Sequence, residues 1–181
     1  SGRGNRGVSV LLGRDSPPTW LGNGKREKRY EENEVETLKV LDLATDKLIA
    51  MPRLDEPAYD VDVYKHSEGS QSVVVRQRIN PSGLPFEGNH VVIDNYIEEY
   101  CLSVAQAVGL DGLHDMDLMT DIDGRPKLLE VNPRPSGSIA VSLSLGIPII
   151  DAVISNRLGI QIPNISPKNS ITITERDLWK I

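Results

Sequence analysis

The sequence predicts an α+β fold in which an antiparallel sheet of hairpins has helices packed on one face. Three observations lead to this class. Residues 59–64 and 72–79 each alternate apolar and polar side chains, as strands do, and a short turn separates them. Residues 113–131 repeat this pattern around a turn that contains Asp and Gly. Between the two hairpins, apolar side chains recur at helical spacing over residues 94–109.

Length and composition limit the class of protein. The chain has 181 residues, which suits one domain or two small subdomains. Its net charge of −6 argues against a nucleic-acid partner. No apolar run approaches the roughly 20 residues that cross a bilayer, so we expect no membrane partner. The single cysteine, Cys101, excludes an intramolecular disulfide and favours a cytoplasmic location.

The first eight residues contain three glycines and two arginines, and an apolar strand is expected at 8–12. Glycine-rich backbone can close on a phosphate through its amide groups. A short segment of this composition is also typical of an unstructured tail, so the residues alone leave both readings open. Gly4, Arg6 and Gly7 are the candidate phosphate-binding residues of this segment.

The next part of the chain is expected to connect two regions. Residues 16–28 are rich in turn formers and basic side chains, which predicts an exposed connection. Residues 31–43 predict an amphipathic helix. Residues 47–54 then form an extended segment, which Pro52 restricts to a sheet edge or a bulge.

In the first hairpin, Asp62 is expected to face either Arg76 or Arg78 across the two strands. Two interpretations are open. The pair is either a surface salt bridge worth less than about 1 kcal/mol or part of a functional site to which the arginine contributes its charge. Residues 80–89 follow as a loop rich in Pro and Gly.

The helix at 94–109 has clear ends, because Asp94 is a natural N-cap and Gly109 a natural stop. Cys101 is expected to be a core thiol, since no histidine near it in sequence would activate it. The expected apolar stripe consists of Ile97, Cys101, Val104 and Val108. Beyond the second hairpin, we expect helices at 138–145 and 148–158 and a strand at 171–174.

The second hairpin concentrates oxygen ligands. Asp115 and Asp117 share one face of its first strand, and closing the turn brings Glu130 beside Asp117, with Asn132 on the same face. Two carboxylates and an amide oxygen on one patch repel one another unless a cation lies between them, and such hard ligands suit Mg²⁺. A solvated acidic hairpin is the alternative, because turns favour Asp.

A glutamate within the apolar run 128–131 favours the metal interpretation, because burying it without a partner is costly. Arg134 and the backbone amides after Pro135 would add a positive rim for an anion.

Asp117, together with the run from Leu129 to Gly137 (LEVNPRPSG), resembles the metal-binding end of the ATP-grasp superfamily. The run is most similar to the carbamoyl-phosphate-synthase-like carboxylate–amine ligases, and the similarity extends more weakly through most of the chain. The resemblance implies that Mg²⁺, with Mn²⁺ as an alternative, is held against the ATP phosphates by Asp117, Glu130 and Asn132.

The resemblance also implies roles for other residues. Arg134 and Arg76 would be the catalytic residues, at the acyl-phosphate and near the γ-phosphate. Besides the glycine segment, the nucleotide-binding residues would be Met51, Leu54, Ser136 and Gly137.

By the same resemblance, the protein is an ATP-dependent ligase that joins a small-molecule carboxylate to an amine or ammonia through an acyl-phosphate, as a monomer or homo-oligomer. Pro52 and Ala58 stand where the family usually has glutamates that hold the ribose. A non-catalytic nucleotide-binding or assembly module of ATP-grasp fold is therefore the alternative, and a cation site without nucleotide is a third reading.

The expected organisation has three parts: residues 1–14 as the end of a glycine-loop subdomain, residues 15–54 as a helical connection and hinge, and residues 55–181 as the main subdomain with the metal site. In the resembling family a phosphate-binding lysine precedes the glycine loop. The chain begins after that point, so we expect a fragment that is inactive by itself.

Overall fold

The computed structural model describes residues 9–12, 28–31, 51–66, 71–80, 88–161, 163, 165, 167 and 170–174. The chain forms two compact units, Ser1–Arg53 and Leu54–Ile181, and we treat each by itself.

In the first unit, β1 (Ser9–Leu12) pairs in parallel with β2 (Lys28–Glu31). The strand predicted at 8–12 is confirmed. The sequence analysis did not predict β2, which lies between the expected connection and the expected helix and includes one end residue of each, Lys28 and Glu31. The KRYE sequence carries no apolar alternation that would signal a strand. The rest of the expected helix, and the glycine segment with Gly4, Arg6 and Gly7, lie outside the described residues.

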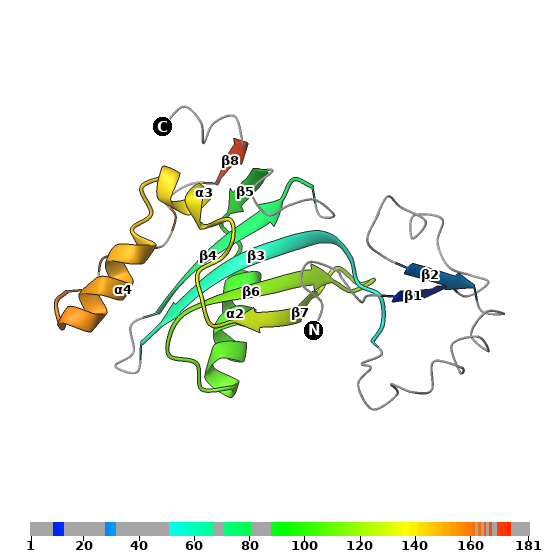
Figure 1. The fold of residues 1–181 in the computed structure, drawn as a ribbon, viewed down its shortest axis with the longest axis horizontal. Helices are drawn as coiled ribbons and strands as arrows, with labels where there is room; N and C mark the ends of the chain where they lie inside the picture. Colours follow the sequence, from blue (N-terminus) through cyan, green and yellow to red (C-terminus); the bar gives the residue numbers. More distant parts are fainter. Residues whose placement is uncertain are drawn as a thin grey trace. The chain divides into compact units, whose positions relative to one another are not determined.

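The second unit is built on a six-stranded antiparallel sheet with strand order β7-β6-β3-β4-β5-β8 (Figure 1). Its strands are β3 (Asp55–Lys65), β4 (Gln71–Arg78), β5 (Gly88–Val92), β6 (Gly112–Thr120), β7 (Pro126–Asn132) and β8 (Ile171–Thr174). Its helices are α2 (Asn95–Ala107), α3 (Ile139–Ser144) and α4 (Ile149–Leu158). The predicted α+β class and both predicted hairpins are confirmed. None of the described helices is long and apolar enough to cross a membrane.

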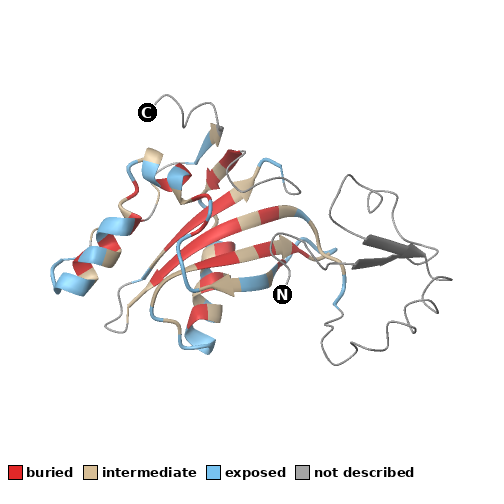
Figure 2. Cartoon of the chain, viewed as in Figure 1, coloured by how far each residue is buried: buried red, intermediate tan, exposed pale blue. Residues whose placement is uncertain are grey.

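Buried side chains occupy both faces of the sheet, and the middle strands are the most fully buried (Figure 2). Val61 and Val63 of β3 pack with α2 on one face, whereas Tyr64 packs with α3 and α4 on the other. The helices therefore cover both faces, which differs from the expected packing on one. Alternation along a strand gives each face its own core, and the two short helices after β7 are long enough to cover part of the second face.

Helix α2 begins as predicted, because the Asp94 carboxylate accepts hydrogen bonds from the amides of Tyr96 and Ile97 at 3.0 and 3.1 Å. Cys101 is completely buried, which confirms a core thiol. The predicted stripe is wrong at its end, where Val108 is 62% exposed because the helix stops at Ala107.

The expected loop at 80–89 is wrong at its end, since β5 (Gly88–Val92) includes Gly88 and Asn89, and residues 81–87 lie outside the described residues. The tail strand at 171–174 is confirmed as β8, which pairs with β5 and forms one edge of the sheet.

Candidate functional site

One face of the sheet changes from apolar to acidic along its strands. Tyr64 of β3 belongs to the core beneath α3 and α4, but the same face carries Asp62 and Asp60 further back along the strand. On β6, Asp115 lies opposite Asp62, and Asp117 lies opposite Asp60. Four carboxylates thus gather on two neighbouring strands, on the part of this face that the core does not use.

Strand β7 adds the two further ligands that the sequence of the second hairpin predicted. Glu130 lies opposite Asp117, and Asn132 lies opposite Asp115, so the predicted pairing is confirmed. A bulge leaves Leu129 without a pairing partner on β6, and Glu130 is exposed beside it. The expectation of a buried glutamate is therefore wrong, because the bulge places this side chain at the surface.

The carboxylate oxygens of Asp60, Asp115 and Asp117 lie within 4.8 Å of one another. Asp60 and Asp115 are 1% and 3% exposed, so their charges are largely removed from water. The sequence analysis did not include Asp60 in the metal set. The sequence did contain an indication of this residue: Asp60 alternates with apolar side chains in the YDVDVY segment, which becomes the central strand β3.

Crowding and burial shift the pKa values of these carboxyl groups. Burial, together with the neighbouring Asp60, raises the pKa of Asp117 to about 8. Burial, followed by the charges of Asp60 and Asp62, raises the pKa of Asp115 to about 6. Burial also opposes ionisation of Asp60, but hydrogen bonds and ion pairing with Arg78 outweigh it and hold that pKa below its ordinary value.

Arg78 of β4 lies between two members of this cluster. Its Nε donates to Oδ1 of Asp60 at 2.9 Å, and its Nη2 donates to Oδ1 of Asp117 at 3.0 Å. This guanidinium offsets part of the repulsion between the two carboxylates and fixes their positions.

The sequence left open whether Arg76 or Arg78 faces Asp62. Arg76 forms this ion pair, and both side chains are completely buried. Its Nε donates to Ser138 Oγ at 3.0 Å, and its Nη1 donates to Ser142 Oγ. The interpretation as a surface salt bridge is wrong, because α3 covers the pair. A catalytic role for Arg76 stays a prediction.

The donor set suits a hard divalent cation. Oδ1 of Asp115 is buried and has no hydrogen-bond partner among the described residues, which is costly unless a ligand completes its coordination. Clustered carboxylate oxygens of this kind are the ligands that Mg²⁺ and Mn²⁺ prefer. The residues therefore fit the expected metal.

The rim of the site contains the other predicted residues. Arg134 is half-exposed, and its Nη1 donates to Oδ2 of Asp115 at 3.1 Å. Ser136 is buried and its amide already donates to Oδ1 of Asp62 at 3.1 Å, whereas Gly137 is exposed. The structure thus brings Arg134, Ser136 and Gly137 to the acidic face.

The two predicted hinge residues fall on either side of the division between the compact units. Met51 is 54% exposed in the first unit, and Leu54 is half-buried at the start of the second. Their part in holding a nucleotide stays a prediction.

Comparison with known proteins gives a consistent result. A family model described as "ATP-grasp in the biosynthetic pathway with Ter operon" matches residues 44–177, which is most of the chain. No curated protein gave a match.

Several solved structures are similar in fold. N5-carboxyaminoimidazole ribonucleotide synthetase from Thermus thermophilus has a TM-score of 0.56 at 16% identity, over 81% of this chain and 42% of that one. The Thermotoga maritima synthetase has a TM-score of 0.54 at 13% identity, over 70% and 37% of the two chains. A biotin carboxylase from Campylobacter jejuni has a TM-score of 0.51 at 20% identity, over 62% and 27%. The chain thus spans less than half of each of these structures.

Proposed function

The chain belongs to the ATP-grasp family that the matching model describes, and we propose that it contributes the metal and phosphate site of an ATP- and Mg²⁺-dependent ligase. The proposed reaction joins a small-molecule carboxylate to an amine or ammonia, as in carbamoyl-phosphate-synthase-like enzymes. The activity is proposed for the whole protein, because the chain spans less than half of the similar structures.

The observation that carries the proposal is the acidic face on β3, β6 and β7. Asp60, Asp115 and Asp117 converge, Glu130 lies opposite Asp117, and Asn132 completes the row. Burying several carboxylates without neutralising all of them lowers the stability of the fold, so stability alone does not explain this cluster. It is well explained by a cation that carries polyphosphate.

In this proposal, Asp117, Glu130 and Asn132 would hold Mg²⁺, with Asp60 and Asp115 beside them, and the bound ion would supply positive charge to the phosphates of ATP. The substrate carboxylate oxygen attacks the γ-phosphorus, and the bond to ADP breaks. The amine nitrogen then attacks the acyl carbon, phosphate leaves, and the nitrogen loses a proton to solvent.

The residues of the chain act by position and charge, since phosphoryl transfer requires little covalent help from the protein. Arg134, half-exposed beside Asp115, would hold the acyl-phosphate. Arg78 keeps Asp60 and Asp117 in place, and Arg76 anchors α3 to β3 through Asp62 and two serines. No protein nucleophile is required.

The test is ADP formation by the complete protein, measured with ATP, Mg²⁺, ammonia and a panel of small carboxylates. Activity that depends on both the carboxylate and the metal supports the proposal. ATP binding without turnover for any acid would favour the non-catalytic module, which Pro52 and Ala58 at the expected ribose positions also favour.

A further inference from the structure

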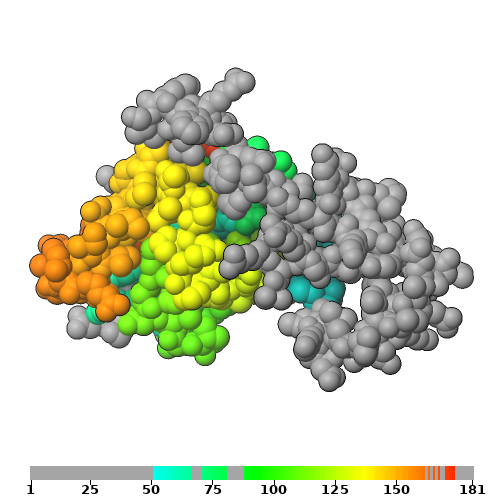
Figure 3. Space-filling view, in the orientation of Figure 1, coloured from blue at the N-terminus to red at the C-terminus, as the bar shows by residue number. Residues whose placement is uncertain are grey.

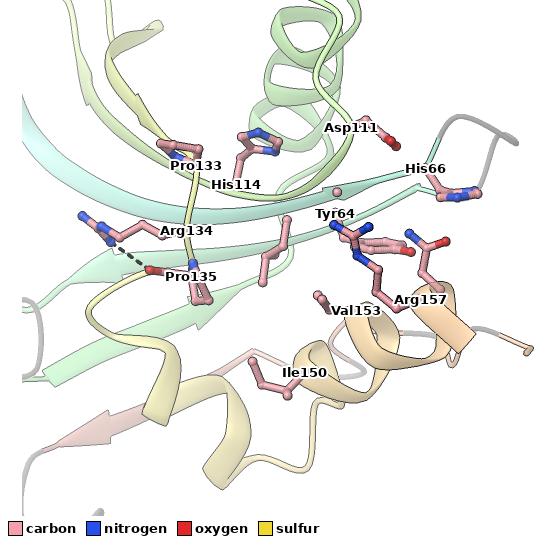
Figure 4. Close-up of a pocket in the computed structure, with 13 residues that line it drawn as sticks. Tyr64, His66, Asp111, His114, Pro133, Arg134, Pro135, Ile150, Val153 and Arg157 are labelled. Atoms are coloured by element: carbon pink, nitrogen blue, oxygen red, sulfur yellow. Dashed lines mark hydrogen bonds between the residues drawn. The ribbon is translucent and has the colours of Figure 1, made fainter. Parts of the chain in front are cut away.

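A pocket of about 570 Å³ lies next to the acidic face but outside it. Residues at the start of β6, the segment after β7 and one side of α4 line it (Figure 4). In the space-filling view, the yellow segment that follows β7 lies beside the orange α4 (Figure 3). This volume is in the range of small-molecule sites, and no residue of the pocket except Arg134 belongs to the site described above.

The pocket has a cation at each end. Arg134 and Arg157 lie on opposite sides of the pocket, and Figure 4 shows the Arg134 guanidinium turned away from Arg157 and donating to the carbonyl oxygen of Pro135 at 2.8 Å. Arg157 is exposed and forms no ion pair with any residue in the described part of the chain. The lining contains one acid, Asp111. The lining thus holds two arginines against one aspartate. Arg134 is also paired with Asp115 at 3.1 Å, so Arg157 is the lining arginine without an ion pair among the described residues.

Two polar atoms in the wall have no partner among the described residues. They are the hydroxyl of Tyr64, whose side chain is 1% exposed, and Nδ1 of His114. A buried hydroxyl without a hydrogen bond is unfavourable, and an anionic oxygen in the pocket would be a strong acceptor for it.

Apolar side chains also line the pocket. They are Leu113 of β6 and Ile150 and Val153 of α4, and Figure 4 shows Val153 next to Arg157. A ligand that matches the lining has an anionic group at each end and an apolar body between them.

We propose that this pocket binds the acid substrate of the ligase, and that the substrate is a small dicarboxylic acid or a similar doubly anionic acid. One carboxylate would lie at Arg134, where the acidic face begins, and the other at Arg157. The inference that this acid is the substrate rests on the proposed function. The inference that the pocket binds a doubly anionic acid does not.

The probe is glutarate, titrated into the 181-residue chain without ATP or metal and followed by methyl NMR of Leu113, Ile150 and Val153. Butyrate carries one carboxylate on a similar body, and glutaramide carries none. We expect glutarate to shift these methyl signals, butyrate to bind at least about tenfold more weakly, and glutaramide to leave the signals unchanged.

Arg157→Gln should weaken glutarate binding about tenfold and leave butyrate binding unchanged, since the variant removes one end of the site. Arg125→Gln, in the exposed turn between β6 and β7, is the matched control and should change neither. Tyr64→Phe should weaken glutarate binding about fivefold without lowering the melting temperature, because it removes a hydroxyl that has no partner among the described residues.

Equal affinity for glutarate and glutaramide, or full glutarate affinity in Arg157→Gln, would overturn the inference. Glu130→Gln separates this result from the proposed function. Unchanged glutarate binding in that variant supports an acid site apart from the acidic face. Tighter binding would overturn the inference, because it would show that the probe lies beside Glu130, whose negative charge the substitution removes.

Discussion

Asp117 and Glu130 lie directly opposite each other on β6 and β7, yet their surroundings differ. Asp117 is held by Arg78 at 3.0 Å, whereas Glu130 is exposed next to the bulge and accepts a hydrogen bond from Asn132 at 3.1 Å. One carboxylate is fixed before any cation arrives, and the other is accessible from solvent. The pair therefore has a rigid side and a side that can adjust to the ligand.

The first prediction concerns Glu130→Gln. In the complete protein this substitution should abolish Mg²⁺-dependent ADP formation, because it removes a charged ligand. The melting temperature of the metal-free protein should stay within about 2 °C, since an exposed side chain contributes little to the folded state.

Asp123→Asn is the matched control, because Asp123 is an exposed acid in the turn of the same hairpin. It should retain full activity and metal dependence. A large loss of stability in Glu130→Gln, with metal dependence intact, would show that Glu130 is a structural carboxylate.

The second prediction concerns pH. The pKa of Asp117 is raised from 3.8 to about 8, so the folded protein keeps this proton at pH values where the unfolded chain has released it. The free energy of unfolding of the metal-free protein should therefore fall as pH rises from about 4 to about 8. Asp115, with a pKa raised to about 6, adds to the decline in the lower part of this range.

Asp117→Asn mimics the protonated side chain and should flatten this decline. Chemical denaturation in the presence of a chelator, at several pH values, measures both proteins. Parallel curves for the two proteins would contradict the assignment of the raised pKa to Asp117.

The pairing of β6 with β7 was predictable from the sequence, because an Asp-Gly turn between two apolar segments fixes the register to within a residue. The bulge at Leu129 was not predictable, since it depends on how the twisted strands fit. Placing Glu130 at the surface follows from that single extra residue.

Arg76 shows a second limit of sequence reasoning. In the segment VVVRQRI an arginine looks like a side chain on a solvent-facing edge. It is buried because α3 brings Ser138 and Ser142 over it, and Asp62 provides the opposite charge. Contacts between segments more than 60 residues apart are not encoded in local alternation. The same limit kept Asp60 out of the predicted metal set.

The third prediction follows from that burial. Arg76→Met should lower the free energy of unfolding by about 3–5 kcal/mol, because it leaves Asp62 as an unpaired buried charge. Adding Asp62→Asn to this variant should restore part of the loss. Arg125→Met is the control: Arg125 is 62% exposed in a loose 3.6 Å ion pair, so the change should be within about 0.5 kcal/mol. A loss below about 1 kcal/mol for Arg76→Met would mean that water reaches the pair.

The last prediction concerns Cys101. Burial, with a smaller effect of Glu98, raises the pKa of this thiol to about 12, so almost no thiolate exists at neutral pH. Iodoacetamide at about pH 8 should modify the native chain at least about a hundredfold more slowly than the chain unfolded in urea. Mass spectrometry gives a clear count, because the chain has one cysteine.

Substitutions at Cys101 separate packing from chemistry. Cys101→Ser should cost roughly 1–3 kcal/mol of stability, because it places a hydroxyl among the apolar side chains beneath α2. Cys101→Ala should cost less than Cys101→Ser, since it introduces no polar group. Both variants of the complete protein should keep their turnover, because the proposed reaction needs no protein nucleophile. Rapid alkylation of the native chain, or loss of turnover in Cys101→Ala with stability unchanged, would make the thiol a participant in catalysis and contradict the proposed mechanism.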